Sequence, residues 1–174
     1  MNYKHFGVML DCSRNAVMKV EKLKYLIDCL QKMEYNTLEL YMEDTYEIEG
    51  EPYFGYLRGR YSKNDIKEID AYAKERGIEL IPCIQTLGHF SNLVRHEVYQ
   101  NIVDVNDIWL VGEPATYTLI EKIFKTLSEN FTSRNVNMQR LLIWVMYCSW
   151  MNPKRMNLLK RYSSLCRKVF LRAM

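Results

Sequence analysis

Residues 37–61 decide the fold: the apolar run TLELYM (37–42) is followed directly by EDTYEIEGEPYFGYLRGRY (43–61). The first run has the length and apolar character of a buried strand. The second is rich in glycine, aromatic and charged residues and has no helical period, so it predicts a long ordered loop. A strand that leads into such a loop is typical of α/β proteins, in which functional residues follow the strand ends.

The alternation of strand and helix continues on both sides of this stretch. Before it, the pattern predicts a strand at 6–10 and a helix at 20–30; after it, a helix from about residue 66 that Gly77 stops, a strand at 79–85 and a helix at 117–131. Apolar strands alternating with amphipathic helices form a parallel sheet covered by helices. Because a complete barrel needs about 250 residues, we expect an α/β fold, a partial (β/α)8 barrel with the first three to four βα units.

The amino-acid composition indicates a single folded domain and excludes several classes of protein. The 174 residues are 48% hydrophobic and 26% charged, which suits one soluble globular domain and excludes general disorder. No apolar run approaches the roughly 18 residues of a membrane span, and the N-terminus MNYKHF lacks a secretory signal, so we expect a cytoplasmic location. The five cysteines show no CxxC or Cys/His spacing, so we expect reduced, mostly buried thiols and no metal site.

The charge divides the chain into two parts. All 21 acidic residues lie at or before Glu129, whereas the residues after Arg134 include basic side chains and no acidic ones. We therefore treat residues 1–134 and the basic segment 135–174 as different parts of the chain, and in the second part the spacing between Leu158 and Phe170 predicts an amphipathic helix. Such a helix can lie on an anionic membrane, bind an acidic partner or touch nucleic acid through its phosphates, or it can simply cover an incomplete barrel. We expect no nucleic-acid partner.

Polar and aromatic residues follow each predicted strand, and seven of them are candidate substrate-binding residues: Asp11, Arg14, Glu43, Asp44, Tyr53, Gln85 and His89. Because the carboxyl ends of parallel strands meet on one face, we expect them to converge. Three alternatives stay open. Asp11 and Arg14 equally suit an ion pair between strand and loop. A lone histidine such as His89 is more often structural. Adjacent Glu43 and Asp44 point to opposite faces of a strand, so at most one enters a shared pocket without a bulge.

The loop at 43–61 suits a carbohydrate ligand. Its tyrosines and Phe54 stand beside carboxylates and arginines. Aromatic rings stack on the apolar faces of sugars, and charged groups bind sugar hydroxyls. The alternative is that these rings only cover the rim of the barrel.

Three blocks of the sequence, at 8–17, 41–61 and 81–89, resemble family 20 glycoside hydrolases, the β-N-acetylhexosaminidases, and are most similar to the bacterial exo-hexosaminidases. The resemblance covers about residues 6–137, so we assign residues 1–137 to the N-terminal part of the family domain and residues 138–174 to a divergent basic tail. It implies a (β/α)8 barrel that removes terminal β-linked N-acetylglucosamine or N-acetylgalactosamine from glycans without a metal or organic cofactor. It also implies substrate-assisted retaining catalysis, in which an Asp orients the sugar's acetamido group and the adjacent Glu is the acid/base.

The sequence departs from this family where the Asp-Glu pair should stand. Asn135-Val136-Asn137 leads into MQRLLIWVM (138–146) instead of an acidic motif. We therefore assign no catalytic residues and expect a truncated or out-of-frame relative without activity. The open edges of an incomplete barrel also predict self-association.

Overall fold

The computed structural model describes residues 4–14 and 17–138. The described residues divide into two compact units, one formed by residues 4–14, 17–84 and 129–137 and the other by residues 85–128 and 138. The predicted basic helix and nearly all of the predicted tail therefore lie outside the described residues.

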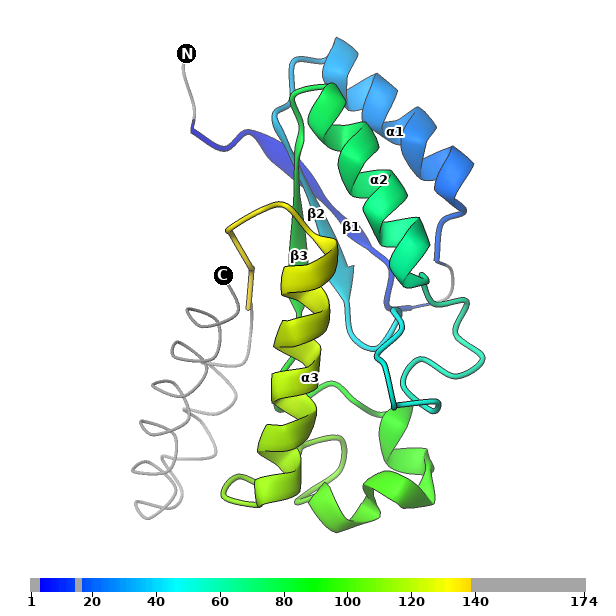
Figure 1. Ribbon diagram of the computed structural model, residues 1–174, viewed down its shortest axis with the longest axis vertical. Helices are drawn as coiled ribbons and strands as arrows, with labels where there is room; N and C mark the ends of the chain where they lie inside the picture. Colours follow the sequence, from blue (N-terminus) through cyan, green and yellow to red (C-terminus); the bar gives the residue numbers. More distant parts are fainter. Residues whose placement is uncertain (1–3, 15–16, 139–174) are drawn as a thin grey trace. The chain divides into compact units, whose positions relative to one another are not determined.

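The first unit is a parallel sheet with two helices on one face (Figure 1). Its elements follow in the order β1 (Gly7–Asp11), α1 (Val20–Lys32), β2 (Thr37–Met42), α2 (Lys63–Glu75) and β3 (Glu79–Ile84), and the strand order is β1-β2-β3. Asn137 forms a parallel bridge with Cys83 on the outer side of β3. The predicted α/β class with a parallel sheet is confirmed, and β2 has the bounds that the sequence predicts.

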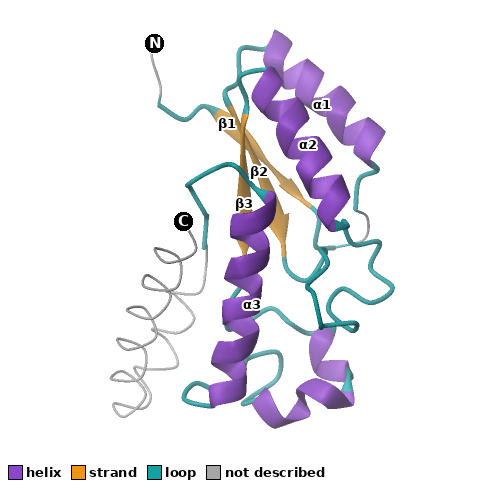
Figure 2. Cartoon of the chain, viewed as in Figure 1, coloured by secondary structure: helices purple, strands orange, loops and turns teal. Residues whose placement is uncertain are grey.

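Amphipathic patterning explains why α1 and α2 cover the sheet. In α1, Leu23, Ile27 and Leu30 recur at helical spacing and are buried. In α2, Ser62 caps the N-terminus in a capping box with Asp65, which satisfies backbone donors that the first turn leaves open. The long loop between β2 and α2 lacks regular secondary structure apart from turns and isolated bridges, as expected (Figure 2).

The register aligns the carboxyl ends of the strands. Asp11 pairs with Tyr41, which in turn pairs with Cys83. At the opposite end, a Cβ on Gly7 would lie 2.2 Å from the carbonyl oxygen of Thr37, so this position admits only glycine. Because the register aligns Asp11 with Tyr41, the turn after Asp11 and the loop after Met42 start from neighbouring points on the sheet.

The second unit is built around Trp109, which is fully buried and stacks on Phe90 at 4.9 Å between ring centroids. It contains two 3-10 helices, η1 (Leu93–Arg95) and η2 (Glu97–Ile102), and most of α3 (Pro114–Asn130). Across residues 4–14 and 17–138, no helix combines the length and the apolar content that crossing a bilayer requires.

Candidate functional site

Asp11 shapes the turn that follows β1. Its Oδ1 accepts hydrogen bonds from the backbone N–H of Ser13 at 2.7 Å and from the Ser13 hydroxyl at 2.6 Å. The neighbouring Arg14 does not pair with Asp11; its Nη2 lies 3.8 Å from Oε1 of Glu43. The ion pair left open between Asp11 and Arg14 is therefore not formed, and each has a different partner.

Arg14 and Glu43 differ sharply in exposure. The Arg14 side chain is 65% exposed, whereas that of Glu43 is 3% exposed. Glu43 Oε1 accepts no hydrogen bond from any described residue. A guanidinium that faces solvent is thus held electrostatically by a carboxylate beneath it, and its remaining N–H donors can bind an oxygen-rich ligand.

A second arginine, Arg58, joins the two strand ends from the buried side. Its Nη2 donates a hydrogen bond to the carbonyl oxygen of Ser13. The same nitrogen lies 3.6 Å from Glu43 Oε2 and 3.1 Å from Asp44 Oδ1. We call Arg14, Glu43, Asp44 and Arg58 the arginine–carboxylate cluster.

The expectation that Glu43 and Asp44 point to opposite faces is wrong. Both carboxylates contact Arg58. The physical reason is that β2 ends at Met42, so the alternation of side chains between two faces no longer applies to the next two residues.

Burial raises the pKa of Glu43 to about 7, against opposing effects from Arg14 and Arg58 and with smaller contributions from Asp44 and Asp11 that raise it. A carboxyl group with this pKa changes charge near neutral pH. Its hold on Arg14 therefore weakens as the pH falls below 7.

The loop at 43–61 separates its aromatic residues into two groups. Tyr46, Phe54 and Tyr61 are buried, and Tyr46 and Phe54 contact each other edge to face at 5.1 Å. Tyr53 and Tyr56 are 40% and 50% exposed and form their own edge-to-face pair. The first group is the core of the loop, and the second leaves ring surface accessible to a ligand.

Gln85 and His89 belong to the second unit. Gln85 is fully buried. His89 is partly buried and has a φ of 64°, a left-handed conformation that non-glycine residues seldom adopt. The arginine–carboxylate cluster therefore contains candidate residues that follow the first and second strands. Gln85 and His89, which follow the third strand, are not members of it.

The comparisons with known proteins agree with this architecture. The family model described as "Glycosyl hydrolase family 20, catalytic domain" matches residues 3–138. The chain belongs to glycoside hydrolase family 20.

Individual relatives carry names from the same family. Beta-hexosaminidase subunit A1 of Dictyostelium discoideum is 31% identical over 74% of the chain, and the beta-hexosaminidase of Vibrio furnissii is 26% identical over 78%. The matched regions are 27% and 28% of those relatives, so the chain spans little more than a quarter of their length.

Solved structures show the same fold. The exo-β-N-acetylglucosaminidase of Vibrio harveyi, crystallised in complex with N-acetylglucosamine, has a TM-score of 0.80 at 18% identity; 98% of this chain and 34% of that one are covered. The β-N-acetylhexosaminidase of Bacteroides fragilis has a TM-score of 0.68 at 24% identity, with 76% and 31% covered.

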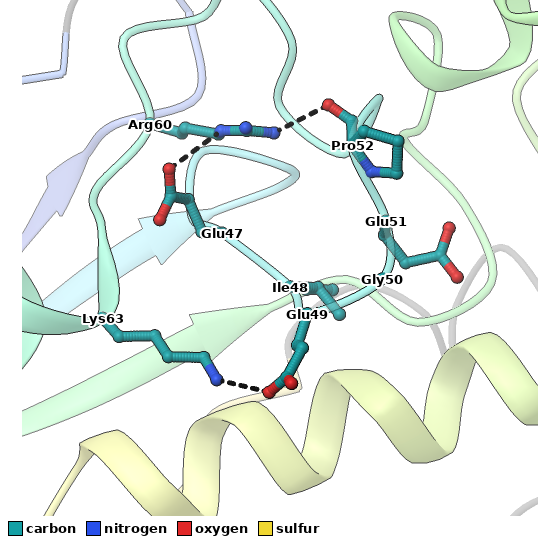
Figure 3. Close-up of a pocket in the computed structure, with 8 residues that line it drawn as sticks. All are labelled: Glu47, Ile48, Glu49, Gly50, Glu51, Pro52, Arg60 and Lys63. Atoms are coloured by element: carbon teal, nitrogen blue, oxygen red, sulfur yellow. Dashed lines mark hydrogen bonds and ion pairs between the residues drawn. The ribbon is translucent and has the colours of Figure 1, made fainter.

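A separate hollow of about 390 Å³ lies along the same loop of this family 20 chain (Figure 3). Its cations are engaged by its own acidic residues: Lys63 Nζ lies 2.8 Å from Glu49 Oε2, and Arg60 Nε lies 3.6 Å from Glu47 Oε1. Arg14 is also paired with a carboxylate, but its side chain is 65% exposed, against 26% for Arg60 and 36% for Lys63. We therefore place the candidate site at the arginine–carboxylate cluster.

Sequence reasoning missed one member of the cluster, Arg58. The loop contains two arginines, Arg58 and Arg60, and composition does not separate the one that reaches the strand ends from the one that does not. Within the part of the chain that the structure describes, no group of three or more His, Cys, Asp or Glu residues is arranged to hold a metal ion.

Proposed function

We propose that the described residues are the N-terminal part of a (β/α)8 barrel of family 20, with the arginine–carboxylate cluster at the rim where substrate binds. The parallel order β1-β2-β3, the helices between successive strands and the bridge from Asn137 to β3 support this proposal. In barrels of this kind, ligands bind at the carboxyl ends of the strands, and the cluster stands at two of those ends.

The proposed ligand is a terminal N-acetylhexosamine, a neutral sugar with several hydroxyl groups. The observation that carries this proposal is the exposed guanidinium of Arg14 above the buried carboxylate of Glu43. A guanidinium offers donors in a planar fork, which suits neighbouring hydroxyl oxygens on a ring. The exposed rings of Tyr53 and Tyr56, from the loop that also supplies Arg58, can stack on the apolar face of the sugar.

The 174-residue chain is proposed to bind this sugar without hydrolysing it. No Asp or Glu follows Glu129, so the chain lacks the Asp-Glu pair that the resemblance to the family implies after the fourth strand. General acid–base catalysis alone contributes about 10²- to 10⁴-fold to a reaction. Glu43 and Asp44 do not replace the pair, because both are buried and bound to Arg58.

NMR titration of the ¹⁵N-labelled chain with N-acetylglucosamine tests the binding proposal. We expect shifts of the backbone signals of 11–14, 43–44 and 53–58, and we expect Arg14→Met to remove them. Arg95→Met is the matched control, because Arg95 is an exposed arginine of the second unit. Shifts that are absent from the wild-type chain, or that survive Arg14→Met unchanged, contradict the proposal.

A further inference from the structure

Arg14 and Arg58 hold opposite oxygens of the same carboxylate. Arg14 lies on the Oε1 side of Glu43 and Arg58 on the Oε2 side. Their exposures differ, at 65% for Arg14 and 16% for Arg58. Arg14 is therefore the guanidinium that a ligand can reach, whereas Arg58 acts on the protein side of the cluster.

Arg58 also fixes the backbone that carries Arg14. Its hydrogen bond to the carbonyl oxygen of Ser13 is made to the residue directly before Arg14, across 45 positions of sequence. Asp11 holds the N–H and hydroxyl of the same Ser13. The turn is thus anchored from β1 by Asp11 and from the β2–α2 loop by Arg58.

The loop backbone directs Arg58 inward. Leu57 and Gly59, on either side of it, have φ values of 58° and 65°. The N–H of Arg58 donates to the carbonyl oxygen of Gly55 at 3.1 Å. A left-handed leucine that is 88% exposed gains little from packing of its own side chain. This conformation is consistent with a loop held in shape by the contacts of the arginine beside it.

We propose that Arg58 is a positioning residue for the sugar site: it fixes the Ser13 turn and the Glu43 carboxylate, and thereby sets the direction in which Arg14 presents its guanidinium. The part of this inference that concerns sugar binding rests on the proposed function. The part that concerns Ser13, Glu43 and Arg14 holds in the sugar-free protein.

Arg58 also affects the protonation of Glu43. Arg58 contacts two carboxylates whose side chains are each 3% exposed, and a buried charge without a counter-ion is strongly unfavourable. Without Arg58, Glu43 would therefore take up a proton more readily. A neutral Glu43 attracts Arg14 less and no longer holds its guanidinium in place.

Substitution of Arg58 tests the inference with two variants and a matched control. Arg58→Met removes the charge and the hydrogen bond, and Arg58→Lys keeps the charge without the planar fork. Arg60→Met is the control, because Arg60 lies in the same loop and instead contacts Glu47 and the carbonyl oxygens of Pro52 and Phe54. Thermal unfolding checks the fold of each variant. NMR then follows the carboxyl titration of Glu43, the ¹⁵Nε signal of Arg14 and the affinity for N-acetylglucosamine.

We expect Arg58→Met to raise the pKa of Glu43 by about one unit or more, to shift the Arg14 signal and to weaken sugar binding about tenfold. Arg58→Lys should restore the Glu43 titration and only part of the affinity. Arg60→Met should leave all three readouts near their wild-type values.

Three results would overturn the inference. The first is a folded Arg58→Met protein with unchanged Glu43 titration and Arg14 signal. The second is an equal effect of Arg60→Met, which would indicate general loosening of the loop. The third applies if Arg58→Met does not fold: wild-type affinity in Arg58→Lys would then exclude the positioning role. If the wild-type chain binds no sugar, the proposed function fails, and the Glu43 and Arg14 readouts still decide whether Arg58 positions them.

Discussion

Gly55 lies against the backbone of Asp44 so closely that a Cβ on the glycine would be 2.1 Å from the Asp44 carbonyl oxygen. Gly55 also has a φ of 67°. These two facts join the middle of the long loop to the end of β2, next to the carboxylates that Arg58 holds. The cluster therefore depends on a close approach between two backbone segments as well as on its charges.

Gly55→Ala should destabilise the protein more than Gly77→Ala. Both glycines are left-handed, with φ values of 67° and 70°, but a Cβ on Gly77 meets no atom within 4 Å. The alanine at 77 thus incurs only the backbone strain of about 1 kcal/mol, whereas the alanine at 55 adds a steric clash. Urea unfolding of the two variants measures the difference, and equal losses of stability would show that the close approach does not exist in solution.

The pH dependence of stability should contain a contribution from Glu43. Burial raises its pKa from the usual 4.5 to about 7 in the folded chain, so the folded state binds the proton more tightly than the unfolded state. The resulting stabilisation is full below about pH 4.5 and is lost as the pH rises through 7. Glu43→Gln should therefore flatten the fall in the free energy of unfolding between these two pH values.

The measurement is the difference in the free energy of unfolding between wild type and Glu43→Gln at each pH. Asp70 also has a pKa raised by burial, and it contributes to the slope of both proteins equally. A slope that Glu43→Gln leaves unaltered would mean that the Glu43 carboxyl is not desolvated as the structure places it.

The sequence predicts the regular elements of this protein better than its site. Strand 37–42 is apolar throughout its buried side, and the helix predicted at 117–131 is observed at 114–130. Both depend on periodicity over neighbouring residues. The contact from Arg58 to Ser13 crosses a loop without a period, so no local pattern encodes it.

The lack of a periodic pattern also explains why the sequence does not predict which aromatic residues of the loop are buried. Phe54 and Tyr56 are two positions apart, yet the first is fully buried and the second is half exposed. The backbone turns at Gly55 and at Leu57, which have φ values of 67° and 58°, on either side of Tyr56. Strand alternation does not predict the directions of the Glu43 and Asp44 side chains, because both residues lie beyond Met42, where β2 ends.

Self-association through β1 is a further prediction. Among the described residues β1 pairs only with β2, and Met9 on this strand is 43% exposed. An edge strand with exposed apolar side chains favours pairing with a second copy. Light scattering after size-exclusion chromatography should show a mass that rises with concentration, and Met9→Lys should reduce it. Met33→Lys is the control, since Met33 is exposed at the end of α1. A monomer at all concentrations contradicts the prediction.

The 174-residue chain should release no measurable product from a chromogenic β-N-acetylglucosaminide. The reason is the absence of acidic residues after Glu129, which leaves no carboxyl group to protonate the leaving oxygen from the position that the family implies. Steady-state assays with purified chain check this. Clear turnover that Glu43→Gln abolishes would instead assign the acid step to Glu43.

A crystal structure of the chain with N-acetylglucosamine tests the proposed sugar site. We expect the sugar at the carboxyl ends of β1 and β2, with hydroxyl oxygens within about 3 Å of the Arg14 guanidinium and with Glu43 and Asp44 still bound to Arg58. A sugar bound elsewhere, or an Arg14 side chain that makes no contact with it, would exclude the arginine–carboxylate cluster as the sugar site.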